Sequence, residues 1–205
     1  MKIGLVSDVH SAPAPLAEAI AHFHEQQVDR ILCAGDIAGY NDGLSETIDL
    51  LIEHDVQCIA GNHDESWLQR HADASGRDHE FLSGLPKTLE LEIDTLKVTV
   101  VHAEPPTATH GGIRLINIEG DPIPERLEQW QDRLQDERMD VLIVGHTHQV
   151  YAMELGGTFV VNPGSSVFNH SCMILDLPDC TVQTIALSGQ AIEPVWNWSK
   201  YVNRG

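Results

Sequence analysis

The chain has 205 residues, of which 31 are acidic and 12 are basic, and its formal net charge is −19 at neutral pH. This charge repels phosphate backbones and no basic stripe is visible, so long nucleic acid is not an expected partner. No apolar stretch is long enough to span a membrane, and too few apolar residues precede Asp8 to form a signal peptide. We therefore expect a cytoplasmic protein, and the length and 42% apolar content predict a single domain over residues 1–205.

The first sixty residues alternate between strand-like and helix-like patterns. Leu16, Ile20 and Phe23 recur at helical spacing, which predicts an amphipathic helix over residues 14–27. The same kind of spacing predicts a second helix over residues 44–54. Apolar runs before, between and after these helices complete a strand–helix–strand–helix–strand order. That order predicts parallel strands joined by right-handed crossovers.

The middle of the chain is more polar. Residues 65–84 predict irregular structure, with at most a short helix at 66–70. Alternating apolar residues predict a hairpin that pairs residues 88–93 with 96–101. The loop over 103–122 is rich in Pro, Thr and Gly, and a loop of this length in a compact domain is often functional.

The last third is mostly strand-like. A charged helix is predicted to open at Pro124 and end near Arg138. The strands predicted after it cover residues 141–145, 149–155, 158–162, 171–177 and 180–187. We expect the aromatic tail, residues 193–205 with Trp196, Trp198 and Tyr201, to pack on a sheet face. The whole order, first α/β and then mostly β, predicts an α/β fold with two stacked sheets covered by helices.

Five apolar runs end abruptly in residues that bind metals. In open α/β sheets, ligands gather beyond the carboxyl ends of the strands, so we expect these residues to form one centre. The donors are carboxylate, amide and imidazole groups, which suit borderline first-row divalent metals such as manganese, iron, zinc or nickel. Their number exceeds the need of one tetrahedral ion and fits two ions that share a carboxylate. The candidate ligands are Asp8, His10, Asp36, Asn62, His102, His146 and His148.

Taken in order, these blocks resemble the calcineurin-like metallophosphoesterases. The matching motifs are Asp8-x-His10, Gly35-Asp36, Gly61-Asn62-His63-Asp64, His102 and Gly145-His146-Thr147-His148. The resemblance covers about residues 1–187. In length, the chain is most similar to the small single-domain bacterial and archaeal phosphodiesterases. It implies a four-layer αββα sandwich, in which helices flank two mixed β-sheets.

The resemblance also implies a role for each motif residue. One metal would take Asp8, His10, Asp36 and His148, and the other would take Asp36, Asn62, His102 and His146, with Asp36 bridging. Manganese is the metal most expected at both positions. A hydroxide between the two metals would attack phosphorus in line. His63 would stay off the metals and assist, either by protonating the leaving oxygen or by stabilising the phosphoryl charge. The expected activity is a phosphodiesterase that hydrolyses a small phosphate ester.

Two positions depart from the pattern of related enzymes. Gly39 and Tyr40 stand where the protein-phosphatase branch has an Asp and a phosphate-binding Arg, which disfavours phosphoserine substrates. His102 is followed by Ala103-Glu104, where Gly is usual. We hypothesise that the charge of Glu104 disfavours highly charged monoesters.

Other residues and other functions stay open at this point. Tyr40, Asn41 and His110 are candidate substrate contacts, because they lie at a strand end or in the long loop. A substitute phosphate clamp could come from Arg70, Arg77 or Arg114. The alternative enzymes are a phosphomonoesterase and a nucleotide pyrophosphohydrolase. The alternative outside catalysis is a protein-interaction scaffold of the same fold, as in the retromer subunit.

Overall fold

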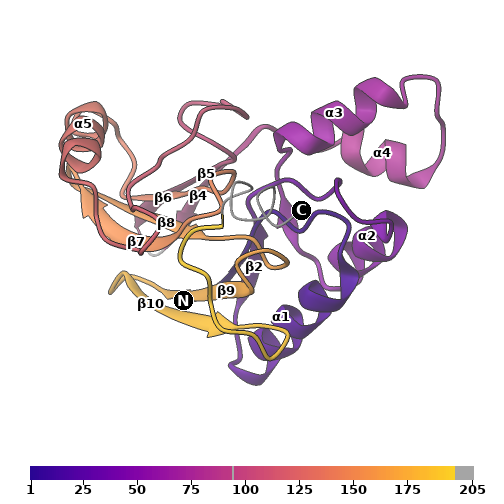
Figure 1. Ribbon diagram of the computed structural model, residues 1–205, viewed down its shortest axis with the longest axis horizontal. Coiled ribbons are helices and arrows are strands. Elements are labelled where there is room, and N and C mark those ends of the chain that lie inside the picture. Colours follow the sequence, from indigo (N-terminus) through magenta and orange to yellow (C-terminus); the bar gives the residue numbers. More distant parts are fainter. Residues whose placement is uncertain (94, 197–205) are drawn as a thin grey trace, which may run out of the picture.

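The computed structural model describes residues 1–93 and 95–196, which form two mixed five-stranded sheets packed face to face (Figure 1). The first sheet has the order β10-β9-β1-β2-β3 and the second has the order β4-β5-β6-β8-β7. In the first sheet β1, β2 and β3 are parallel, and in the second β5, β6 and β8 are parallel. The predicted α/β class with two stacked mixed sheets is therefore confirmed.

The chain builds the first sheet before the second and then returns to it. The first part contains β1 (Lys2–Val6), α1 (Pro13–Glu25), β2 (Arg30–Cys33), α2 (Leu44–Glu53), β3 (Gln57–Cys58), α3 (Asn62–Arg70) and α4 (Arg77–Ser83). The second sheet and its helix consist of β4 (Thr88–Ile93), β5 (Leu96–Val101), α5 (Pro124–Leu134), β6 (Val141–Ile143), β7 (Val150–Leu155) and β8 (Thr158–Pro163). The strands β9 (Ser171–Asp176) and β10 (Thr181–Ala186) then rejoin the first sheet.

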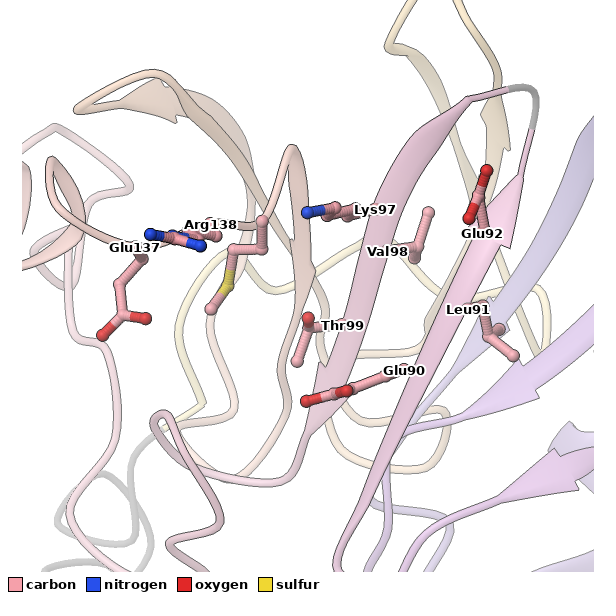
Figure 2. Close-up of a pocket in the computed structure, with 9 residues that line it drawn as sticks. Glu90, Leu91, Glu92, Lys97, Val98, Thr99, Glu137 and Arg138 are labelled. Atoms are coloured by element: carbon pink, nitrogen blue, oxygen red, sulfur yellow. The ribbon is translucent and has the colours of Figure 1, made fainter.

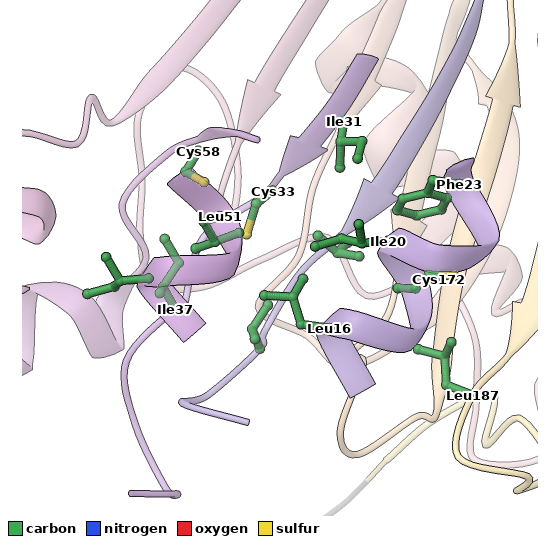
Figure 3. Packing of buried hydrophobic residues seen from close by; sticks show 14 of the residues in the cluster. Leu16, Ile20, Phe23, Ile31, Cys33, Ile37, Leu51, Cys58, Cys172 and Leu187 are labelled. Carbon is green, nitrogen blue, oxygen red and sulfur yellow. The ribbon is translucent and has the colours of Figure 1, made fainter. Parts of the chain in front are cut away.

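Three apolar clusters separate the four layers. Leu16, Ile20 and Phe23 of α1 pack on the outer face of the first sheet together with α2 (Figure 3). A second cluster fills the space between the two sheets, and a third joins α5 to the outer face of the second sheet through Trp130 and Leu134. Each sheet therefore buries both faces, at least in part, which explains the continuous apolar runs in its central strands.

The structure corrects several predicted boundaries. The segment 65–84 is more helical than expected, because α3 begins at Asn62 and α4 forms a further helix. In α4 the buried residue is Leu82, and a single buried position produces no apolar periodicity that would reveal the helix. The first helix ends at Glu25 because Gln27 adopts a left-handed backbone, and the charged helix ends at Leu134 instead of near Arg138. Within the described residues, no helix is both long and apolar enough to cross a membrane.

Candidate metal centre

The ends of strands from both sheets meet at one edge of the molecule. Asp8 follows β1, Asp36 follows β2 and Asn62 follows β3, all in the first sheet. His102 follows β5, and His146 and His148 follow β6, in the second sheet. The register aligns Val6 with Cys33 and Cys33 with Cys58, so the three strands of the first sheet end side by side. All seven candidate ligands thus lie at the same edge.

Asp8, His10 and His148 form the first group of donors. The Nε2 atom of His148 lies 3.1 Å from Asp8 Oδ1 and 3.2 Å from the Nε2 atom of His10. The other carboxylate oxygen of Asp8 accepts hydrogen bonds from Ser7 Oγ (2.6 Å) and the backbone N–H of His146 (3.0 Å). These bonds orient Asp8 so that Oδ1 faces the two imidazoles.

Asp36, Asn62, His102 and His146 form the second group. His102 Nε2 lies 3.4 Å from Asp36 Oδ1 and 3.1 Å from Asn62 Oδ1, while His146 Nδ1 lies 2.9 Å from the same Asn62 oxygen. His102 Nδ1 lies 2.7 Å from the carbonyl of Ala34, to which it donates. The opposite nitrogen therefore faces two acceptor oxygens, and only a proton or a cation between them makes this arrangement favourable.

The two groups are close enough to share members. Ligand atoms of Asp36, His10 and His63 also lie within 4.8 Å of one another, so Asp36 stands between the two groups. The backbone N–H of His63 donates to Asp36 Oδ1 at 2.8 Å. Nitrogen and oxygen donors that converge in this way fit borderline divalent metals.

The pKa values of the buried groups show how strongly they interact. Burial tends to raise the pKa of Asp8, but the nearby charge of His148 lowers it below its ordinary value. Burial similarly opposes the charged form of His102, but Asp36 outweighs it and raises the pKa of His102 to about 10. Burial lowers the pKa of His10 to about 4, and burial with the charge of His102 does the same for His146. The carboxylate of Asp36 thus favours the charged form of His102, and a metal ion bound by both groups would compete with that proton.

Asp64 connects the loops that carry the ligands. It is fully buried, and its two carboxylate oxygens accept hydrogen bonds from the backbone N–H groups of Ala38 (2.7 Å) and Gly61 (2.8 Å). Burial, and next the charge of Asp36, raises the pKa of Asp64 to about 7. Asp64 therefore supports the ligand loops and does not belong to the groups of converging donors.

The backbone of the centre is tight and strained. A Cβ atom on Gly61 would overlap Asp36 Oδ1, so only glycine lets this loop approach the shared carboxylate. Five of the candidate ligands adopt the left-handed conformation that side chains rarely adopt. Their φ values are 50° for Asp8, 49° for His10, 55° for Asp36, 63° for His146 and 48° for His148.

An aromatic wall borders the centre. The ring of Phe168 stacks on Trp196 with centroids 4.3 Å apart, and both rings contact His148. Tyr40 continues this wall, with its ring 4.6 Å from His63 and 4.7 Å from His10. The expectation that Trp196 packs on a sheet face is therefore wrong, while Trp198 and Tyr201 lie outside the described residues. No local sequence pattern predicts that Trp196 and Phe168 lie beside the centre, because their placement depends on contacts between distant segments.

A hollow of about 210 Å³ opens above the ligands. Besides Asp36, Asn62, His146 and His148, it is lined by His63, Tyr40, Arg114 and Trp196, among others. Of the three arginines considered from sequence, Arg114 lines this hollow, whereas Arg77 forms an ion pair with Asp49.

The other predicted contacts have different surroundings. Asn41 donates its side-chain N–H to the carbonyl of His10 at 2.8 Å, which steadies the loop after β1. His110 is exposed, with its ring 6.3 Å from that of His146, and does not line the hollow. Glu104 pairs with Arg133 of α5 at 3.2 Å, so much of its charge is compensated away from the ligands. This pairing weakens the hypothesis that Glu104 repels charged monoesters.

A separate depression lies away from the ligands, on the outer face of the β4–β5 hairpin (Figure 2). Glu90, Glu92, Lys97 and Thr99 line it, together with residues that follow α5. It contains none of the histidines that converge at the strand ends. The chemistry of this chain therefore centres on the hollow above the strand ends.

Two stacked mixed sheets with a buried His/Asp cluster at their strand ends define a class of metal-dependent hydrolases. Residues 1–179 match the calcineurin-like phosphoesterase superfamily domain, and the chain belongs to this superfamily. It is a hydrolase of the metallophosphoesterase type, and this confirms the resemblance seen in its motifs.

Three known proteins illustrate the relationship. A probable metallophosphoesterase of Methanothermobacter thermautotrophicus is 27% identical over 196 residues, which are 94% of this chain and 90% of that protein. A hypothetical protein of Pyrococcus horikoshii has a similar fold, with a TM-score of 0.69, 17% identity and coverage of 99% and 91% of the two chains. The fold also resembles an archaeal phosphodiesterase, with a TM-score of 0.60, 22% identity and coverage of 91% and 100%.

Proposed function

We propose that the protein is a dinuclear metal-dependent phosphodiesterase that hydrolyses a small phosphate ester. The observation that carries this proposal is the pair of donor groups joined at Asp36, with His63 on the wall of the hollow above them. One ion would be held by Asp8, His10, Asp36 and His148, and the other by Asp36, Asn62, His102 and His146. The mixed oxygen and nitrogen donors suit manganese, and also iron, zinc or nickel.

The residues of the hollow divide the work on a phosphate ester. Divalent metals bound there would supply Lewis acidity, which lowers the pKa of water and offsets the charge on phosphoryl oxygens. Arg114 would add a positive charge to the lining of the hollow, and its guanidinium forms no ion pair with the described residues. The ring of His63 would lie against the leaving oxygen and donate a proton to it.

Gly39 leaves room for the ring of His63 on the wall of the hollow. Its φ of 131° favours glycine, and a Cβ atom there would lie 2.8 Å from His10 Nδ1 and 3.0 Å from His63 Nδ1. The next residue places the ring of Tyr40, and not a guanidinium, against His63. With an aromatic surface in place of a second positive charge, the hollow favours a diester with one negative charge over a monoester with two.

The test is hydrolysis of bis(p-nitrophenyl) phosphate and p-nitrophenyl phosphate by protein supplied with manganese. We expect turnover that depends on metal and a higher kcat/KM for the diester. Turnover of neither compound would refute the phosphoesterase activity, and preference for the monoester would favour a phosphomonoesterase.

A substitution tests the role of His63. His63→Ala should keep its metals, measured by elemental analysis, and lose roughly 10²- to 10⁴-fold in kcat. His22→Ala is the matched control, because His22 lies on α1, where its side chain pairs with Glu25 at 3.7 Å, and it neither lines the hollow nor belongs to the donor groups. Unchanged turnover in His63→Ala would rule out the assigned role.

A further inference from the structure

A second hollow lies on the other side of Tyr40 and His63. It encloses about 430 Å³, and these two residues are the ones it shares with the hollow above the proposed ligands. The remaining lining comes from the loops after β1 and β2, from the start of α2 and from α3. These residues are Ser11, Gly39, Asn41, Asp42, Leu44, Trp67 and Arg70.

The position of His63 gives the two hollows different roles. A group that protonates a leaving oxygen must lie within hydrogen-bonding distance of it. If the phosphorus lies above the ligands, a leaving oxygen beside His63 directs the rest of the leaving group past Tyr40. The leaving group then enters the second hollow, and the retained substituent stays on the side of Arg114 and Trp196.

The chemistry of the second hollow indicates what kind of group fits there. Tyr40 and Trp67 contribute aromatic surface, and Tyr40 is 49% exposed. Arg70 is exposed at the end of α3 and forms no ion pair with the residues that the structure describes. In a chain with a net charge of −19, an unpaired guanidinium beside aromatic rings is a feature that an anionic aromatic ligand would recognise.

We propose that this second hollow is the leaving-group subsite, and that it takes a planar aromatic leaving group that carries a negative charge. A nucleotide has this chemistry. The proposal rests on the proposed function, because it uses His63 as the proton donor. It adds a substrate class that the metal ligands do not specify.

The test compares two methyl phosphodiesters whose leaving groups differ in charge. One releases 4-nitrophenol and the other releases 3-carboxy-4-nitrophenol, so the reacting bond and the retained group are the same. We expect wild type to prefer the carboxylated diester about three- to fivefold in kcat/KM, as an exposed ion pair allows. Arg70→Gln should reduce this ratio to about one, whereas Arg126→Gln, an exposed arginine on α5, should keep the wild-type ratio.

A second comparison locates the aromatic contact. Methyl 4-nitrophenyl phosphate and bis(4-nitrophenyl) phosphate share a leaving group and differ only in the retained group. Trp67→Leu should raise KM about tenfold for both, and Trp67→Phe should restore most of the loss. A loss confined to the bis compound would overturn the proposal, because the hollow would then hold the retained group. A wild-type ratio of one for the carboxylated diester would overturn it as well.

Product binding separates this proposal from the proposed function. Titration of 3-carboxy-4-nitrophenol into protein kept in chelator reports on the subsite without any turnover. Binding that Arg70→Gln weakens would support the subsite even if no diester were hydrolysed. Equal binding by wild type and Arg70→Gln would refute the subsite even in an active enzyme.

Discussion

The side chain of Gln149 fastens the long loop 103–122 to the second sheet. Its Oε1 accepts the backbone N–H of Leu115 at 2.8 Å, and its Nε2 donates to the carbonyl of Ile116 at 2.7 Å. All three residues are buried. Arg114 lies next to this clamp, so the clamp positions the guanidinium that lines the hollow.

The backbone N–H of Ile116 also donates to Gln149 Oε1, at 3.4 Å. Gln149→Met removes all of these hydrogen bonds while it keeps the length of the side chain. The Leu115 N–H and the Ile116 carbonyl then remain buried without these partners, at a cost of about 1–3 kcal/mol each. We expect the free energy of unfolding to fall by about 2–6 kcal/mol, which lowers Tm by roughly 4–24 °C for a domain of this size. Because Arg114 loses its support, KM for the diester should also rise.

Urea unfolding of the variant in chelator measures this loss without a contribution from bound metal. Gln183→Met, at an exposed position of β10, is the matched control and should stay within about 0.5 kcal/mol of wild type. A loss below that limit in Gln149→Met would show that the loop does not depend on this clamp.

Three further predictions concern the centre itself. Gly61→Ala should lower kcat more than tenfold and reduce the bound metal, because the new Cβ displaces Asp36; normal activity and metal content would contradict this. Trp196→Leu should cost about 0.5–1.5 kcal/mol in urea unfolding beyond the loss of buried area, because it removes the stack on Phe168; the reasoning fails if Trp196→Phe is equally destabilised. Manganese at about 100 times its Kd should raise the free energy of unfolding by about 2.7 kcal/mol. Asp36→Asn should abolish most of this gain, and a full gain in that variant would argue against a shared carboxylate.

The parts of the fold that follow from local patterns could be predicted from the sequence. Apolar residues recur at helical spacing in α1 and at every second position in the strands of the β4–β5 hairpin, whose turn residue Asp94 lies outside the described residues. The strand predicted after the second helix is present as β3, although only Gln57 and Cys58 join the sheet. The helix α4 could not be predicted, since it buries little.

The candidate site could likewise be predicted only in part from the sequence. Strand ends that carry metal-binding residues meet because parallel strands align, and a sequence shows where strands end. The neighbours of these residues depend on contacts across the chain: Trp196 reaches His148 from 48 residues away, and Gln149 holds a loop that precedes it by 33 residues or more. Neither contact leaves a periodic pattern, so the aromatic wall and the loop clamp follow only from the three-dimensional fold.

The left-handed backbone at the strand ends shows that the fold itself places the ligands. Each such residue other than glycine costs roughly 1–3 kcal/mol, and such strain persists only where the surroundings hold it. Here the backbone N–H of Asp8 donates to the carbonyl of Gly35 (2.9 Å), and that of His10 donates to the carbonyl of Asp36 (2.9 Å). These bonds tie the loop after β1 to the loop after β2, so the donors converge through protein contacts. Metal binding would then require little backbone rearrangement, because the strained backbone already holds the donors in converging positions.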